Sequence, residues 1–195
     1  MLFLGGGKME ERIIEKVGIF VDGGYVDRVL LDEFNRTRIS YGKLSQKLAA
    51  GREILRTYYY HCPPYQSHSP TPEERNRFSN AERFFASLNQ LPRYEVRLGK
   101  LARHRRDDGS IEYKQKGVDI LLAIDLVQLS AKNLITHAVL FASDSDYVPA
   151  IHRAKDNGVT IHLVHGNRSN ISSNLWTECD DRTQIDQAFI DSIRL

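Results

Sequence analysis

Four aspartates stand where apolar segments of the chain end or begin. Asp22 directly follows the apolar run VGIFV. Asp144 and Asp146 follow a second apolar run that ends at Ala142, and Asp119 opens a long apolar segment. Carboxylates that lie close together raise one another's pKa, so a fold that gathers them needs a cation to offset the repulsion. Oxygen ligands alone favour hard ions, and Mg²⁺ or Mn²⁺ is therefore the expected partner.

The chemistry that such a cluster supports is phosphodiester hydrolysis. Two hard cations about 4 Å apart can activate a water molecule and stabilise the leaving oxygen. The structural alternative is that the aspartates cap helices, but one cap explains one carboxylate and not the whole set. The sequence has no P-loop, dinucleotide fingerprint or Ser-His-Asp pattern. His61, Cys62 and His165 lie near expected strand ends but lack a third and fourth ligand at zinc-like spacing.

The elements that must position these aspartates alternate between strand and helix. Strands are expected over residues 17–21, 54–61, 94–101, 110–114, 136–142 and 158–165. Helices are expected over 24–34, 40–50, from Thr71 onward with Pro72 in first position, and over 117–132, 147–156 and 169–179. This order predicts an α/β fold with a mostly parallel sheet and helices on both faces. Functional sites in such sheets lie at the carboxyl ends of the strands, where the aspartates fall.

Two of the expected helices constrain the acidic residues further. On a helical wheel the polar positions Asp125, Gln128 and Lys132 lie about 180–240° from Asp119. Asp119 thus occupies the apolar side of a helix that should be buried, where it serves either as a metal ligand or as a helix cap. Pro149 is tolerated only in a first helical turn, which puts Asp144 and Asp146 at a strand-to-helix junction.

A basic segment precedes Asp119 in the chain. Its members are Arg93, Arg97, Lys100, Arg103, Arg105 and Arg106, followed by Lys114 and Lys116. Two paired strands joined by Asp108-Gly109 would form a basic β-hairpin arm beside the acidic site. Such an arm suits attraction to a phosphate backbone, although a solvated hairpin balanced by its own acids is the alternative. Tyr147 is a candidate for stacking on an unpaired base or, equally, for packing beneath the junction.

Composition limits the remaining possibilities. The chain has 195 residues, a net charge of +2 and two cysteines far apart in sequence. A net charge this small means that any affinity for nucleic acid must come from a local patch. The cysteines predict neither a disulfide framework nor a zinc ribbon, which favours a cytoplasmic protein. The apolar start Met1–Leu4 is too short for a signal peptide, and no apolar run is long enough to span a membrane.

Three ordered motifs resemble those of NYN domains of the LabA type. They are Phe20–Tyr25 (FVDGGY), Lys116–Asp125 (KGVDILLAID) and Ser143–Tyr147 (SDSDY), the last followed by Gly158-Val159. The similarity runs from about Val17 to the C-terminus. It implies a three-layer PIN-like (Rossmannoid) fold with about five central strands, in which residues 1–16 form a flexible tail and 17–195 one domain. Residues 63–116 would then be an insertion that carries a helix and the basic hairpin.

The resemblance also implies a function. It points to a metal-dependent ribonuclease, an endonuclease acting on single-stranded or structured RNA, in which Asp22, Asp119, Asp144 and Asp146 bind Mg²⁺ or Mn²⁺. Asp125 is interpreted as structural. Many members carry asparagine where this chain has Tyr25, and some relatives are regulators. The alternative is therefore an inactive RNA-binding or protein-binding regulator. The segment 63–91 is open to two roles, a homodimer contact or a substrate clamp.

Overall fold

A computed structural model describes residues 15–105 and 109–195, apart from the side chains at 102–105, 111–112, 114–115 and 169. The expected tail over residues 1–16 therefore lies outside the described residues except at its end, where Lys16 already begins the first strand.

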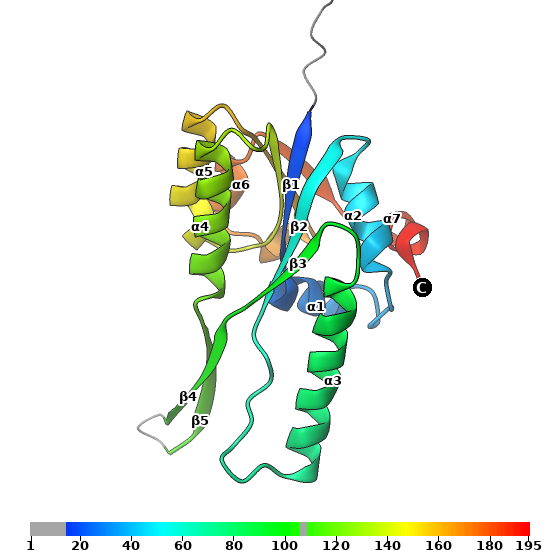
Figure 1. Cartoon of the computed structure of the whole chain (residues 1–195), viewed down its shortest axis with the longest axis vertical. Coiled ribbons are helices and arrows are strands. Elements are labelled where there is room, and N and C mark those ends of the chain that lie inside the picture. Colours follow the sequence, from blue (N-terminus) through cyan, green and yellow to red (C-terminus); the bar gives the residue numbers. More distant parts are fainter. Residues whose placement is uncertain (1–14, 106–108) are drawn as a thin grey trace, which may run out of the picture.

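One sheet of six parallel strands forms the centre of the protein (Figure 1). Its order is β3-β2-β1-β6-β7-β8. The strands are β1 (Lys16–Asp22), β2 (Glu53–His61), β3 (Tyr94–Leu98), β6 (His137–Phe141), β7 (Thr160–His165) and β8 (Asp181–Gln184). Strand β1 is buried along its five central residues, as expected of a parallel strand covered on both faces. The predicted α/β fold with a parallel sheet is confirmed, with six strands rather than about five.

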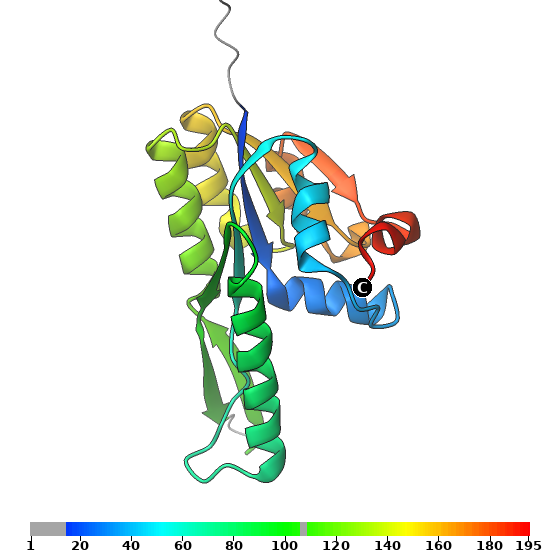
Figure 2. The same cartoon turned by 45° about the vertical axis from the view of Figure 1, so that its right-hand side comes forward.

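Helices cover both faces of the sheet (Figures 1 and 2). They are α1 (Gly23–Asp32), α2 (Tyr41–Ala49), α3 (Pro72–Asn89), α4 (Val118–Ala131), α5 (Val148–Asp156), α6 (Ser173–Glu178) and α7 (Gln187–Ile193). Helices α4 and α5 pack side by side on one face, and α2 packs on the opposite face beside α7. Two predicted starts are confirmed: Ser40 caps α2, and Thr71 forms a capping box with Glu74 ahead of Pro72 in α3.

The strand predicted over 94–101 is in fact two strands that part at Gly99. Strand β3 ends at Leu98 and belongs to the central sheet, whereas β4 (Lys100–Arg105) pairs with β5 (Ile111–Lys116) in a separate antiparallel hairpin. A Cβ at Gly99 would lie 2.6 Å from the carbonyl oxygen of Lys116, so only glycine allows the two segments to approach this closely. The predicted basic hairpin therefore exists, but its first strand begins later.

Helix α4 is less buried than its composition predicts. Val118, Leu122 and Leu126 are buried against the sheet, but Ile120 and Ile124 are 65% and 54% exposed. The expectation of an all-round buried helix is therefore wrong, because only one side of α4 faces the sheet. The other side turns its apolar residues to solvent in the described structure.

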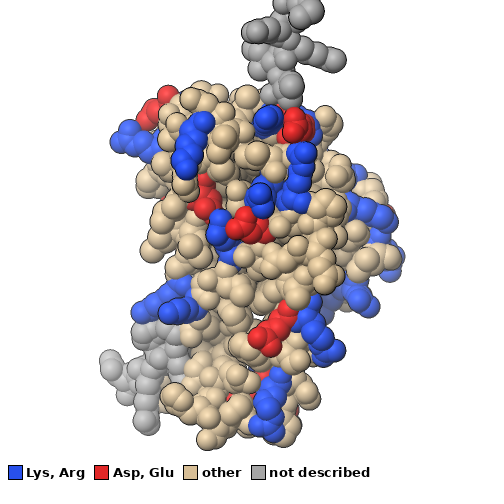
Figure 3. All heavy atoms as spheres, in the orientation of Figure 1, with Lys and Arg blue, Asp and Glu red and all other residues tan. Residues whose placement is uncertain are grey.

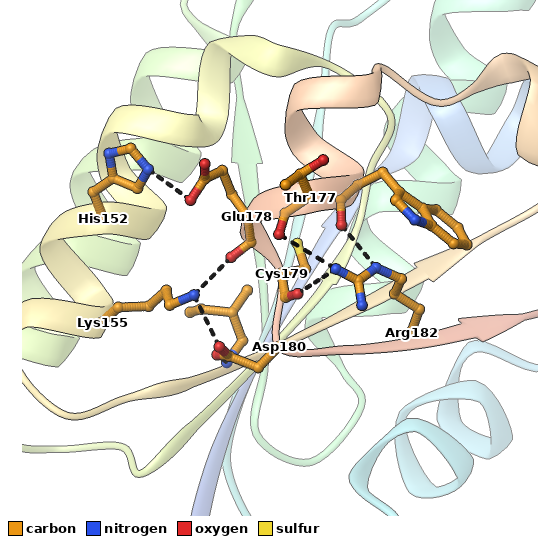
Figure 4. A network of polar contacts seen from close by, with 9 residues as sticks. His152, Lys155, Thr177, Glu178, Cys179, Asp180 and Arg182 are labelled. Carbon is orange, nitrogen blue, oxygen red and sulfur yellow. Dashed lines mark hydrogen bonds and ion pairs between the residues drawn. The ribbon is translucent and has the colours of Figure 1, made fainter.

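Strand β8 and helix α7 were not expected from the sequence, because the β8 segment DRTQ is polar. Its place at the edge of the sheet is secured by polar contacts with α5 and α6 (Figure 4). Lys155 of α5 pairs with Asp180 at 2.9 Å, and the Arg182 guanidinium donates to the carbonyl oxygens of Trp176 and Cys179 at 2.7 and 2.6 Å. These contacts compensate for the missing apolar pattern.

The helix α3 and the β4–β5 hairpin both project beyond the carboxyl ends of the central strands (Figures 1 and 2). The loop that leads from β2 to α3 runs between them, and its Tyr65 ring lies 5.1 Å from the Tyr113 ring of β5. The two projections thus flank the edge at which the predicted aspartates gather.

Candidate active site at the carboxyl edge of the sheet

Asp22 ends β1 at the point where the strand order of the sheet reverses. From β1 the chain builds outward through β2 and β3, and then returns to place β6 on the other side of β1. Ligands of open α/β sheets bind in the crevice at such a switch point. Asp22 also caps α1, since its Oδ1 accepts a hydrogen bond from the Tyr25 amide at 3.1 Å. The cap accounts for one carboxylate oxygen and leaves Oδ2 directed elsewhere.

Asp119 joins Asp22 through the hydroxyl of Tyr147. This hydroxyl lies 2.7 Å from Asp119 Oδ1 and 3.3 Å from Asp22 Oδ2. A hydroxyl has one hydrogen, so it donates to only one of the two carboxylates at a time. Asp119 does not cap its helix, because Gly117 holds that position with a positive φ of 87°. The cap alternative for Asp119 is thereby excluded.

Asp22 and Asp119 are called the acid pair from here on. Their two negative charges make a site that favours a cation. Burial raises the pKa of Asp22; the Tyr25 amide opposes this rise, and the negative charge of Asp119 adds to it. Burial and the two carboxylates likewise raise the pKa of Tyr147 far above its ordinary value. Two carboxylates that share one hydrogen lack a full set of donors, and a hard divalent ion supplies the missing positive charge. The acid pair therefore fits such an ion.

Asp144 and Asp146 follow β6, the strand next to β1 in the sheet. Neither side chain takes part in the hydrogen bonds that join the acid pair. A short 3₁₀ turn, η1 (Ser145–Tyr147), follows β6, and Asp144 caps it by accepting from the Asp146 amide at 3.1 Å. Both side chains are exposed. Among the described residues no three His, Cys, Asp or Glu side chains are arranged to hold a metal. The structure thus brings two of the four predicted ligands together, and ligation by all four stays a prediction.

Asp125 and Arg97 contact one another on the central sheet. Asp125 accepts from the Tyr60 hydroxyl at 2.9 Å and lies 3.5 Å from Arg97, consistent with the structural role expected for it. Arg97 also pairs with Glu95 at 2.9 Å and lies over the ring of Tyr58. Arg97 thus belongs to β3 of the central sheet and is paired with two acids, and its predicted contact with RNA stays a prediction.

Among the basic residues of the hairpin, only those at its base have described side chains. Lys100 and Lys116 are exposed and face one another across β4 and β5. Lysine and arginine side chains gather where this hairpin joins the body of the protein (Figure 3). The side chains of Arg103, Arg105 and Lys114 lie outside the described residues, as does Arg106 entirely.

Two tyrosines have roles that the sequence did not reveal. The Tyr147 ring is fully buried, which corrects the idea that it stacks on a base; its hydroxyl instead belongs to the site. In the sequence, only the position of Tyr147 directly after Asp146 indicated that this tyrosine belongs to the site. Tyr25, where many relatives carry asparagine, reaches away from the acid pair: its hydroxyl accepts from the Gly166 amide at 3.1 Å, and its ring packs edge-on against Phe141. Burial raises the pKa of Tyr25 to about 12.

A parallel α/β sheet with carboxylates at its switch point is the architecture expected of a PIN-like nuclease fold. The family model described as "NYN domain" matches residues 16–186, and the chain therefore belongs to the NYN family within that superfamily. No helix in the described part of the chain combines the length and apolarity that crossing a bilayer requires.

Two proteins similar to this chain are named without an activity. An uncharacterized protein of Sinorhizobium fredii, y4oD, is 32% identical over 80 residues, which are 40% of this chain and 37% of that protein. This match thus spans little more than a third of its relative. The crystal structure of VPA0982 from Vibrio parahaemolyticus, a protein of unknown function, has a TM-score of 0.62 and 19% identity over 96% of this chain and 100% of that one. This likeness shows the fold.

Proposed function

We propose that the protein is a metal-dependent ribonuclease of the LabA-like type that hydrolyses RNA phosphodiesters internally. The observation that carries this proposal is the acid pair, in which two carboxylates from β1 and α4 share the single hydrogen of a buried tyrosine. The nuclease class of the fold and the lysines at the base of the hairpin support it. We assign Asp22, Asp119, Asp144 and Asp146 as the residues that would hold Mg²⁺ or Mn²⁺.

The residues of the site have separate roles in the proposed reaction. The acid pair holds two carboxylates at the switch point, and the Tyr147 hydroxyl orients both. A bound divalent ion would supply an activated water and positive charge at the phosphate. Lys100 and Lys116 attract the RNA backbone without selecting a sequence. Asp144 and Asp146, exposed at the next strand end, face the same edge of the sheet.

Cleavage of a labelled single-stranded RNA tests the proposal. The wild-type chain is assayed with Mn²⁺, Mg²⁺ or EDTA beside Asp119→Asn, Asp144→Ala and Asp32→Asn, an exposed aspartate at the end of α1 that serves as the matched control. We expect metal-dependent cleavage that falls to background in the first two variants and persists in the third. Wild-type rates in Asp119→Asn would refute the assignment.

The second candidate is a regulator that binds RNA or protein without cutting. It is favoured by the observation that, among the described residues, no three potential ligands are arranged around one metal position. The two functions separate in a thermal melt, since an ion stabilises a protein only if it binds the native state. A rise in Tm with Mn²⁺ that Asp119→Asn abolishes supports the nuclease. No rise, together with no cleavage of single-stranded, hairpin or transfer RNA, supports the regulator.

A further inference from the structure

A cavity lies at the carboxyl end of β2, next to the strand β1 that ends in Asp22. Its volume is about 380 Å³, and it is bounded by the end of β2, the loop that follows, helix α3 and the start of β4. Pro63, Pro64, Phe84 and Phe85 form apolar walls, and Asp27 and His61 provide polar groups. This mixture of aromatic walls and few polar groups is typical of small-ligand sites.

The cavity adjoins the acid pair through the backbone. A Cβ built on Gly23, the residue after Asp22, would lie 2.6 Å from the Cδ2 of His61, so the imidazole rests directly on that backbone. Cys62 lines the cavity as well. Burial raises the pKa of the Cys62 thiol, the hydrogen bond with the Lys116 backbone opposes this rise, and the charges of Asp119 and Asp22 add to it. A group in the cavity therefore lies close to the backbone segment that carries Asp22.

The polar groups of the cavity are fixed by one another. The His61 Nδ1 lies 2.7 Å from the Cys62 carbonyl oxygen, and its Nε2 lies 3.1 Å from Asp27 Oδ2. Both neighbours are acceptors, so an imidazolium that donates from both nitrogens satisfies them best. Burial alone would lower the pKa of His61, but the hydrogen bonds to Asp27 and Cys62 outweigh it and the pKa is raised. Asp27 retains Oδ1 and the second lone pair of Oδ2 to accept from a ligand.

The chemistry of the cavity suits a base and not a phosphate. Phe84, which is half-buried, offers aromatic surface, on which bases of unpaired RNA stack, and the buried Phe85 completes this wall. Both nitrogens of the His61 imidazolium are already engaged by Cys62 and Asp27, so His61 offers a phosphate no donor, whereas the Asp27 carboxylate accepts hydrogen bonds from ring and exocyclic N–H groups. Guanine presents two such donors side by side, N1–H and N2–H, whereas uracil presents one between two carbonyl oxygens. The phosphate backbone instead has the exposed Lys100 and Lys116 available at the base of the hairpin.

We propose that this cavity is a base-binding subsite that takes one unpaired guanine of the RNA strand, with Asp27 accepting from its N1–H and N2–H edge. The subsite rests on the proposed function in one respect, namely that the phosphate beside this guanine is the one presented to the acid pair. In this proposal, Asp27 and the cavity walls determine the sequence preference of the protein. The lysines at the base of the hairpin bind only the phosphate backbone and contribute no preference.

Binding measured without metal tests the subsite separately from cleavage. The full chain is titrated in EDTA with fluorescent six-nucleotide RNAs, one all uridine and one with a single central guanosine, and anisotropy is recorded. We expect the guanosine strand to bind about tenfold more tightly, since a good paired contact to a base edge discriminates at about that level. Asp27→Asn should abolish the preference, so that the guanosine and uridine strands bind with equal affinity, because the amide puts an N–H donor where the carboxylate accepted.

A second pair of variants tests the cavity itself. Ala81→Leu places a larger side chain in the cavity from α3, and Ala86→Leu makes the same change on an exposed position of that helix. The first should lose the guanosine preference and the second should keep it. Equal affinity of the wild type for both strands, no binding to either strand, or an undiminished preference in Ala81→Leu would overturn the subsite. Metal-dependent cleavage would stand or fall independently of these results.

Discussion

The Tyr147 hydroxyl connects two carboxylates that come from elements far apart in the chain. Its ring is fully buried, so the hydroxyl has no access to bulk water and is committed to Asp22 and Asp119. Without this hydroxyl, both carboxylates lose a hydrogen-bond donor in a partly buried position. In the absence of a cation, this loss lowers the free energy of unfolding. The hydroxyl thus stabilises the metal-free state of the acid pair.

Replacement of Tyr147 by phenylalanine tests this role. We expect Tyr147→Phe to lower the free energy of unfolding in EDTA by on the order of 1–2 kcal/mol, the usual cost of leaving a buried group without its partner. Saturating Mn²⁺ should recover most of this loss, because the ion then supplies the positive charge that the carboxylates lack. Urea denaturation with and without Mn²⁺ measures both values.

The control for this substitution is Tyr113→Phe, which removes a hydroxyl from a tyrosine that is 47% exposed on the hairpin. It should leave the unfolding free energy nearly unchanged. A Tyr147→Phe protein as stable as the wild type in EDTA would contradict the account of the shared hydrogen.

At the scale of elements, the junction between β3 and β4 determines where α4 begins. Gly99 donates its amide to the His61 carbonyl oxygen at 2.9 Å, while the Lys116 carbonyl oxygen and the Val118 side chain lie close to its Cα. The hairpin ends at Lys116, three residues before Asp119, and leads directly into α4. A change at this junction should be transmitted to the acid pair.

Alanine at position 99 is expected to disturb this junction. Its Cβ would stand 2.6 Å from the Lys116 carbonyl oxygen and 2.8 Å from the Val118 Cγ2, and the backbone must move to relieve both contacts. We expect Gly99→Ala to destabilise the protein by about 1–3 kcal/mol, the usual cost of overpacking. It should also weaken the stabilisation by Mn²⁺, as thermal melts at several Mn²⁺ concentrations would show.

Gly42→Ala is the matched control, because nothing lies closer than 3.9 Å to a Cβ at that position in α2. It should be neutral or slightly stabilising. If Gly99→Ala and Gly42→Ala proved equally stable, the close approach at the junction would not be what constrains residue 99.

The edge strand β8 depends on a carboxylate that joins three elements (Figure 4). Asp180 accepts from the Ile161 amide at 2.8 Å and from Lys155 at 2.9 Å. Partial burial raises its pKa, but these two donors outweigh that effect and the pKa lies below the ordinary value of 3.8. The ionised carboxylate consequently stabilises the fold above the pKa of the unfolded chain.

This stabilisation should be lost in acid. As pH falls below about 4, the unfolded chain takes up a proton at Asp180 before the folded protein does, and stability declines until the folded pKa is passed. We expect Asp180→Asn to be less stable than the wild type at pH 7 and to approach it toward pH 2–3. Thermal melts across this range, with the exposed Asp156→Asn as control, measure the difference. A pH-independent difference would argue against the ionised contact.

On the scale of the whole molecule, the site is bordered by two projections, α3 and the β4–β5 hairpin (Figure 1). The net charge of only +2 means that attraction to RNA rests on local groups, among which Lys100 and Lys116 lie next to α4. Their contribution should be electrostatic, dependent on salt and independent of sequence.

The double variant Lys100→Gln/Lys116→Gln tests this attraction. We expect weaker binding of all single-stranded RNAs in EDTA and a salt dependence whose logarithmic slope is smaller by about 1.4, the value for two lost contacts to a single strand. Anisotropy titrations between low and physiological salt measure the slope. Lys132→Gln, an exposed lysine at the far end of α4, should leave the slope unchanged. An unaltered slope in the double variant would exclude the hairpin base from the RNA path.

Much of this architecture could be predicted from local patterns in the sequence. Short apolar runs predicted the buried strands β1 and β6, and Ser40 and Thr71 correctly marked helix starts. These signals act over a few residues, and the rule that parallel strands share one carboxyl edge then placed the aspartates together. The polar strand β8 was missed because its stability comes from contacts with α5 and α6 and not from its own pattern.

Residue types and their order along the chain thus determined the class of fold and the edge at which carboxylates gather. Tertiary structure alone decided that Asp22 and Asp119 form the close pair, that Tyr147 turns its hydroxyl to both, and that the charge of Arg97 is balanced by acids. The physical reason is that Asp22 and Tyr147 are separated by 125 residues, so the distance between them depends on how β1, α4 and η1 pack. No local preference of the chain specifies that packing.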